Sequence, residues 1–228
     1  MLNSTLQDCE SLISTMIVES SSFYINDSTI TNMTALVKSG GVYISDNSWL
    51  TIENSTFIDN YGESASDILI NNCQLIFISF TTIYINHNKV VMSFDSSFVS
   101  LEDTVVVGNP VFYIRLLPDS IIILYNLYNL EIQRCVFTNL NSLNAPIRID
   151  SDDSNLNDQL LNLTSTVVIS SSTFSSCSSQ SDGGVLFLNS YFNISISNCQ
   201  FISNMAVDSG GVLISTSSKY IIIKSLII

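Results

Sequence analysis

Charged residues are scarce in this chain, and basic residues are the scarcest of all. Of 228 residues, 7 are Lys or Arg and 20 are Asp or Glu, which gives a formal net charge of −13 at pH 7. Proteins that bind nucleic acid or an anionic membrane by electrostatics use clustered basic side chains. The composition therefore argues against a nucleic-acid partner and against an anionic-membrane partner.

The residues that favour helices are also few. Ala, Glu, Lys and Arg are rare, whereas Ile, Val, Leu, Phe and Tyr alternate with Ser, Thr and Asn. These are the residues enriched in strands and turns, and no segment sustains a 3.6-residue period. With 46% hydrophobic and 12% charged residues the chain is not disordered, and the composition predicts an all-β protein.

The sequence has no apolar run of the roughly 18 residues that a spanning helix needs. The apolar tail from Tyr220 to Ile228 includes Lys224, and we interpret it as a strand. Residues Met1 to Glu10 are polar and lack the apolar region of a signal peptide. We therefore expect no transmembrane segment in this chain and no signal peptide at its start.

The cysteines form no CxxC pair, and their number is odd; they are Cys9, Cys73, Cys135, Cys177 and Cys199. If the chain is a stack of repeats in register, Cys177 lies opposite Asn204 and Cys135 lies opposite Ser172. Neither faces a second cysteine. We expect free thiols on small buried side chains.

What the chain does have is a repeat. The segment Cys199 to Ser215, CQFISNMAVDSGGVLIS, is preceded 27 residues earlier by TFSSCSSQSDGGVLFL. Anchoring each copy on its first large apolar residue gives spacings of 23 to 37 residues, a range typical of solenoids. The anchors are Leu6, Ile30, Phe57, Ile83, Val106, Phe137, Phe174 and Phe201.

Each repeat reads as three short strands. In the clearest copies these are Val42 to Ser45, Trp49 to Glu53 and Ser55 to Ile58, then Val185 to Leu188, Phe192 to Ser197 and Cys199 to Ile202. One such coil cannot bury its apolar side alone, whereas stacked coils pair like strands and share one core. We expect a parallel solenoid of about eight coils forming a single domain over residues 1–228. Because no whole coil closes either end, we also expect a neighbouring chain there or a longer β-helical protein.

Two kinds of residue mark the corners of the predicted coils. Asparagine stands three residues after an anchor at Asn60, Asn86, Asn109 and Asn204, and Cys9 and Cys177 share this position. We expect these side chains to bond the backbone of the bend and their Asn neighbours in adjacent coils. The glycine pairs suit positive φ or close backbone approach. We take the three pairs as equivalent: Gly40 and Gly41, Gly183 and Gly184, Gly210 and Gly211.

The longest spacing contains an acidic insertion at about residues 150–160. Its carboxylates are Asp150, Asp152, Asp153 and Asp158. Carboxylate oxygens at alternating positions suit Ca²⁺, but the Gly and the distal Glu of an EF-hand are missing. We interpret the segment as a solvated loop, with a weak Ca²⁺ site as the alternative.

The pairing of F-x-x-N with a following G-G and two apolar residues resembles the repeats of polymorphic outer-membrane proteins. The matching residues are Phe57 to Asn60, Phe201 to Asn204 with Gly210 to Leu213, and Phe174 with Gly183 to Leu186. Phe174 departs from the motif, since Cys177 stands where Asn is expected. The resemblance implies a right-handed parallel β-helix of the pectin-lyase-like type, exposed at a cell surface or secreted and often adhesive. Its implied partners are carbohydrate or protein.

Many β-helices of this type act on acidic polysaccharides, which requires paired carboxylates or a calcium-assisted base. Here the only histidine is His87, in a polar corner, and the strands carry Ser, Thr and Asn rather than clustered Asp. We therefore predict a non-catalytic structural or adhesive module without a cofactor; a carbohydrate-active protein with an unrecognised site is the alternative. A leucine-rich-repeat-like solenoid is a third possibility, suggested by Leu124, Leu127, Leu130 and Ile132. The sequence lacks the helix-forming segments between strands that such a solenoid needs. For Trp49, Tyr43, Tyr61 and Tyr191 the alternatives are a sugar-stacking or partner-binding surface and aromatic stacking in the core.

Overall fold

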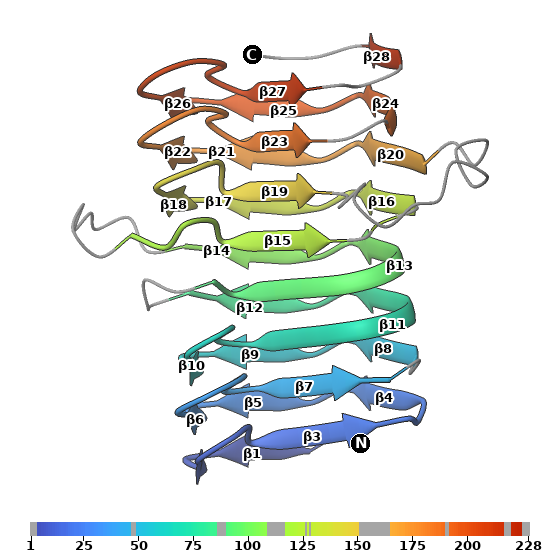
Figure 1. The fold of residues 1–228 in the computed structure, drawn as a ribbon, viewed down its shortest axis with the longest axis vertical. Helices are drawn as coiled ribbons and strands as arrows, with labels where there is room; N and C mark the ends of the chain where they lie inside the picture. The colour runs from blue at the N-terminus through green and yellow to red at the C-terminus, as the bar shows by residue number, and fades with distance from the viewer. Residues whose placement is uncertain are drawn as a thin grey trace.

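The computed structural model describes residues 4–46, 49–85, 90–108, 117–125, 127, 129–150, 165–189, 192–216 and 220–224. These residues form strands and bends but no helix. Figure 1 shows the strands stacked turn upon turn, with the N-terminal strands at one end and the C-terminal strands at the other. Neighbouring strands pair in parallel throughout these residues, so the described part of the chain is a parallel β-solenoid, as predicted.

The strands fall into columns that follow the three strands of each predicted coil. The first column contains β3 (Met16–Glu19), β7 (Val42–Ser45), β15 (Ile122–Tyr125), β19 (Ile147–Asp150), β23 (Leu186–Asn189) and β27 (Leu213–Thr216). The second contains β4 (Phe23–Asn26), β8 (Trp49–Glu53), β16 (Asn129–Gln133), β20 (Ser165–Ser170), β24 (Phe192–Ser197) and β28 (Tyr220–Lys224). Two long strands, β11 (Ile68–Ser79) and β13 (Met92–Glu102), run through both columns and join them into one bent sheet.

A separate sheet of eight strands carries the anchors. Its strands are β1 (Thr5–Gln7), β5 (Thr29–Thr31), β9 (Thr56–Ile58), β12 (Thr82–Tyr84), β14 (Val105–Val107), β17 (Val136–Thr138), β21 (Thr173–Ser175) and β25 (Gln200–Ile202). We call the three columns the first-strand, second-strand and third-strand sheets. A fourth, two-residue strand follows the corner in some turns, which the sequence did not predict: β2 (Glu10–Ser11), β6 (Thr34–Ala35), β10 (Tyr61–Gly62), β18 (Asn141–Ser142), β22 (Ser178–Ser179) and β26 (Met205–Ala206).

The predicted anchors lie directly over one another. All eight are paired in sequence order across the third-strand sheet, from Leu6 with Ile30 to Phe174 with Phe201. The rings of Phe137 and Phe174 stack with centroids 5.0 Å apart, and those of Phe174 and Phe201 with centroids 4.9 Å apart. Eight strands enclose seven complete turns, so the expected eight coils are corrected to about seven turns.

The bend between the second and third strands is the most regular part of the coil. It always holds two residues, and the first of them has a positive φ of 46–54°. The second is a small hydroxyl or thiol residue that donates to the carbonyl two residues before it, at 2.7–3.2 Å. These local bonds satisfy a backbone carbonyl where the chain turns. The donors are Ser28, Ser55, Thr81, Thr104, Cys135, Ser172 and Cys199.

Inside the coil, like residues stack on like. Ile25, Ile52 and Ile78 follow one another at equivalent positions of the second-strand sheet and continue into four more buried aliphatic residues. All seven are at most 2% exposed. Burying a side chain of this size stabilises a fold by about 1.5–3 kcal/mol. The core is therefore a set of continuous apolar columns.

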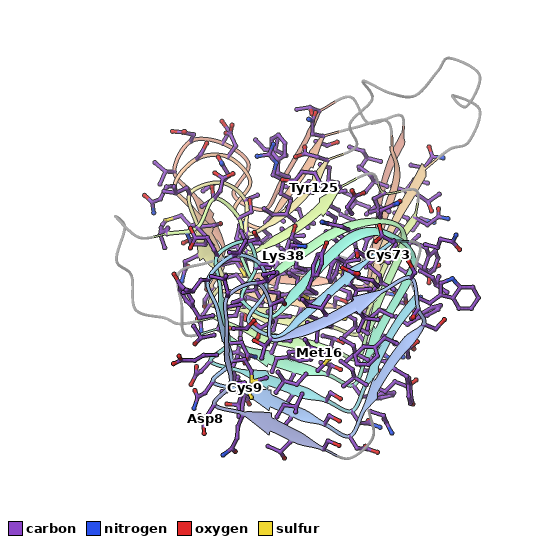
Figure 2. The ribbon with its side chains drawn as sticks, turned by 60° about the horizontal axis from the view of Figure 1, so that its bottom comes forward. Asp8, Cys9, Met16, Lys38, Cys73 and Tyr125 are labelled. Carbon is purple, nitrogen blue, oxygen red and sulfur yellow. The ribbon has the colours of Figure 1, made fainter. Side chains whose placement is uncertain are left out.

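The cysteines are free, and four of the five are buried as expected. Cys135 and Cys199 occupy the hydroxyl position of the two-residue bend. Burial raises the pKa of Cys135 and of Cys177 to about 12. Cys9 differs from the expectation, because it is exposed at the N-terminal end of the stack (Figure 2).

Candidate functional site

Two of the four predicted corner asparagines, Asn60 and Asn204, lie among the described residues. The Asn60 side chain accepts a bond from the backbone N–H of Met33 and donates to the carbonyl of Ile30, both at 3.1 Å. Asn204 makes the same two bonds, to Cys177 N–H and to the Phe174 carbonyl, at 3.0 Å. Each amide thus holds the corner of the preceding turn in place.

Towards the preceding turn, neither Asn60 nor Asn204 stacks on an asparagine. Met33 and Cys177 occupy the corner position of the preceding turn, so the amides bond backbone groups instead. Asn86, Asn109 and His87 lie outside the described residues. The hydrogen bonds of Asn60 and Asn204 thus connect one turn of the fold to the turn before it.

The glycine pairs are not all equivalent, and the expectation was wrong by one residue at Gly40–Gly41. The strand register connects Val42 with Leu186 and Leu213, rather than with the Val that follows each later glycine pair. A Cβ on Gly41 would lie 2.3 Å from the Asp67 carbonyl oxygen, so this glycine permits close approach. The later pairs instead begin with a positive φ, 69° at Gly183 and 64° at Gly210.

Asp67 is a buried carboxylate that no sequence motif predicted, and it is only 1% exposed. Asn60 Nδ2 donates to its Oδ1 at 2.7 Å, and the Ser66 hydroxyl donates to its Oδ2 at 3.1 Å. Burial raises the pKa of Asp67 to about 7, against the opposing effect of these two hydrogen bonds. No described basic side chain forms an ion pair with it. The Asp67 carboxyl is therefore neutral or negatively charged near pH 7, and it is buried with Asn60 at the corner of the coil.

A second polar cluster lies on the outward face of the first-strand sheet, and we call it the Arg148 cluster. Arg148 Nε donates to Asp150 Oδ2 at 2.5 Å, and its Nη1 lies 3.7 Å from Asp119 Oδ2. Asn144 holds the other oxygen of Asp119 at 2.6 Å. The guanidinium lies 5.8 Å from the ring centre of Phe187. Figure 2 labels Tyr125, which is the cross-strand neighbour of Asp150.

The predicted calcium ligands are only partly placed. Asp150 ends β19, one of its oxygens binds Arg148, and its Oδ1 is buried without a hydrogen-bond partner. Asp152, Asp153 and Asp158 lie outside the described residues, as does most of the expected insertion. Within the described residues no group of three or more His, Cys, Asp or Glu is arranged to hold a metal ion. The calcium interpretation stays a prediction.

The candidate aromatic residues do not come together. Tyr43 is buried on the first-strand sheet with Lys38 Nζ 3.5 Å from its ring centre, whereas Trp49 is 53% exposed on the second-strand sheet. Tyr61 is half-buried in β10, and Tyr191 lies outside the described residues. Among the three that the structure describes, Trp49 is thus the one that presents its ring to solvent.

Comparison with known families identifies the class of this protein. The family model described as "Right handed beta helix region" matches residues 16–227, nearly the whole chain. The chain belongs to the right-handed β-helix family. No curated protein and no solved structure matches it. The described residues contain no helix that is long and apolar enough to cross a membrane.

Proposed function

We propose that this chain is a non-catalytic structural or adhesive module that acts at a cell surface, with carbohydrate or protein as its partner. The main observation for the proposal is that the carboxylates of the Arg148 cluster are ion-paired. Asp119 and Asp150 both contact the same guanidinium. A glycosidase needs one protonated carboxyl group and one that activates water or attacks the sugar. Here both groups are ion-paired with one guanidinium, which favours a structural role for them.

The regular solenoid supports the surface location. Repeat folds of this kind expose long flat faces along which a partner can contact several turns. The resemblance to the polymorphic outer-membrane repeats points the same way. Surface labelling of intact producing cells tests the location: we expect modification of the chain without lysis, and protection until lysis would contradict it.

A carbohydrate-active role is the second candidate, because Asp119 and Asp150 do lie near each other. Both carboxylates contact Arg148, so their nearest oxygens are within the ~10 Å that such enzymes span. The experiment incubates the chain with pectin, polygalacturonate, xylan and cellulose and measures new reducing ends and unsaturated products. We expect neither. Product formation that disappears in Asp119→Asn or Asp150→Asn would establish the enzyme instead.

Adhesion itself requires a positive measurement. Beads coated with the chain are passed over surfaces that carry each of these polysaccharides, or a mucin, under flow. We expect retention on at least one surface above that of beads coated with heat-denatured chain. Equal retention of the two bead types on all surfaces would leave the module without an adhesive role.

A further inference from the structure

Aromatic side chains gather on the outward face of the second-strand sheet in the N-terminal half of the stack. Trp49 is 53% exposed, and Tyr24 and Phe77 are each 40% exposed, although all three belong to regular strands. Strand residues that alternate with a buried core face solvent. Contiguous exposed apolar surface on a soluble protein marks a site of interaction.

The strand register fixes how these rings are arranged. Tyr24, Thr51 and Phe77 occupy equivalent positions in three successive turns, so the two rings are separated by one threonine. Trp49, Leu75 and Phe98 form the parallel column two residues away along the strands. The rings of Phe77 and Phe98 contact each other at 5.7 Å between centroids. Adjacent turns are about 4.8 Å apart, so the rings form one patch.

Hydrogen-bonding groups lie between the rings of this aromatic patch. The Tyr24 hydroxyl donates to Glu53 Oε2 at 2.6 Å, and Trp49 Nε1 donates to Gln74 Oε1 at 3.3 Å. Rings interleaved with carboxylate, amide and hydroxyl groups offer apolar faces beside hydrogen-bonding groups, which suits a ligand having both apolar faces and hydroxyls. Cores of protein interfaces are also rich in aromatic residues, but they are depleted in Glu, which here contacts Tyr24.

The charge of the chain further restricts the class of ligand that can bind the patch. Lys38 lies over Tyr43, Arg148 lies on the first-strand sheet, and Arg134 pairs with Glu102 and Asp103. With a net charge of −13 and Glu53 inside the patch, a polyanion is repelled. A neutral chain with apolar C–H faces and many hydroxyls fits both the charge and the groups present.

We propose that Tyr24, Trp49 and Phe77 form a platform on which a neutral polysaccharide binds, with its sugar rings against the aromatic rings. The inference rests on the proposed adhesive function and names the site and the ligand class for it. It places the ligand on the second-strand sheet and not at the Arg148 cluster. In the next three turns of the same sheet the Trp49 column continues with Asn129, Thr166 and Asn193, which carry no ring.

The chain carries its own reporter for this site, because Trp49 is its only tryptophan. The experiment titrates the folded chain with hydroxyethylcellulose, xylan, galactomannan and, as the anionic comparison, polygalacturonate, and follows tryptophan emission and acrylamide quenching. We expect at least one neutral polysaccharide to shift the emission to shorter wavelength and to protect the indole from acrylamide. Polygalacturonate should have little effect.

Two matched variants locate the site. Phe77→Ala keeps the Trp49 reporter and should weaken binding about tenfold or more, as expected when an aromatic contact residue is truncated. Phe187→Ala removes a ring of the same size beside Arg148 and should leave the affinity unchanged. Because Phe77 is exposed, its variant should keep the melting temperature of the parent within a few degrees.

The other results each overturn the inference. Binding without a change at Trp49, or weakened by Phe187→Ala and not by Phe77→Ala, would move the ligand elsewhere while the adhesive function stands. A dimer in light scattering that Trp49→Ala dissociates would make the patch a contact between copies of the chain. Bead retention on mucin alone, without any polysaccharide binding in the titrations, would favour a protein partner and exclude the platform.

Discussion

Asn60 Nδ2 lies 2.7 Å from Asp67 Oδ1, and both side chains are almost completely buried at one corner of the coil. The same amide also holds the backbone of the preceding turn through Met33 and Ile30. The titratable carboxyl of Asp67 is thus hydrogen-bonded to Asn60, the residue that stabilises the bend. The stability of this corner should depend on pH.

Asp67→Asn should remove part of the pH dependence of unfolding. The Asp67 pKa is raised from 3.8 to about 7 by burial, so the folded state holds a proton that the unfolded chain releases. Its contribution is therefore complete below pH 3.8 and is lost as the pH rises to about 7. We expect the free energy of unfolding of the parent to fall relative to the variant over this interval, by a few kcal/mol at roughly 1.4 kcal/mol per unit.

Urea denaturation of both proteins at intervals between pH 4 and 8 measures this difference. Asp208→Asn is the control, since Asp208 is an exposed carboxylate in a different turn. Parallel curves for the parent and Asp67→Asn would show that the buried carboxyl does not titrate in this range.

Gly41→Ala and Gly211→Ala should differ strongly although both residues belong to a glycine pair. A methyl group at Gly41 would lie 2.3 Å from the Asp67 carbonyl oxygen, whereas nothing lies within 4 Å of one at Gly211. We expect Gly41→Ala to lower the unfolding free energy by more than about 2 kcal/mol, and Gly211→Ala to change it by less than about 0.5 kcal/mol. Equal midpoints in thermal unfolding would contradict the close approach of Gly41 to the Asp67 backbone.

Phe174→Ala should be among the most destabilising changes in the core. Phe174 is fully buried and stacks on Phe137 on one side and Phe201 on the other. Large-to-small changes of this kind reduce stability by about 3–5 kcal/mol. Phe201→Ala should be milder, because among the described residues the Phe201 ring stacks on an aromatic ring on one side only. Denaturant midpoints measure both, and the reverse order would argue against stacking as a source of stability.

Thiol labelling should distinguish Cys9 from the other cysteines. Cys9 is exposed, whereas Cys73, Cys135, Cys177 and Cys199 are buried. The thiolate is the reactive form, and burial raises the pKa of Cys135 and Cys177 to about 12. In the native protein a thiol reagent should modify one residue rapidly and all five only after denaturation, and Cys9→Ser should abolish the rapid phase. Rapid labelling of two or more thiols would show that the stack opens.

The positions of the strands could be predicted from the sequence because they depend on local patterns that repeat. The anchors from Leu6 to Phe201 follow from spacing and apolar character alone, and β7, β8 and β24 have the predicted bounds. The predicted strand at Val185 begins one residue later, at Leu186. The cause is the glycine pair, which is placed one residue differently in the two copies.

The sites were less accessible, because they depend on which residues become neighbours across turns. Asp67 looks like an ordinary loop residue until Asn60 is placed beside it. Arg148 was not singled out in sequence, although Asp150 lies two residues after it, because Asp119 joins the cluster from 29 residues earlier. Trp49 was recognised as a candidate, but its neighbours Tyr24 and Phe77 lie 25 and 28 residues away. The corner asparagines left a local signal, and so did the hydroxyl position two residues before each anchor, which is a small residue in every repeat.

The two-residue bend between the second-strand and third-strand sheets keeps one length through every described turn, while the anchor spacing varies from 23 to 37 residues. All variation in repeat length is therefore confined to the other two edges of the coil. The edge formed by this bend has a constant length, whereas the other two edges can gain or lose segments without disturbing the stack. Evolution or engineering can thus diversify loops on two sides of this scaffold while the third keeps the turns aligned.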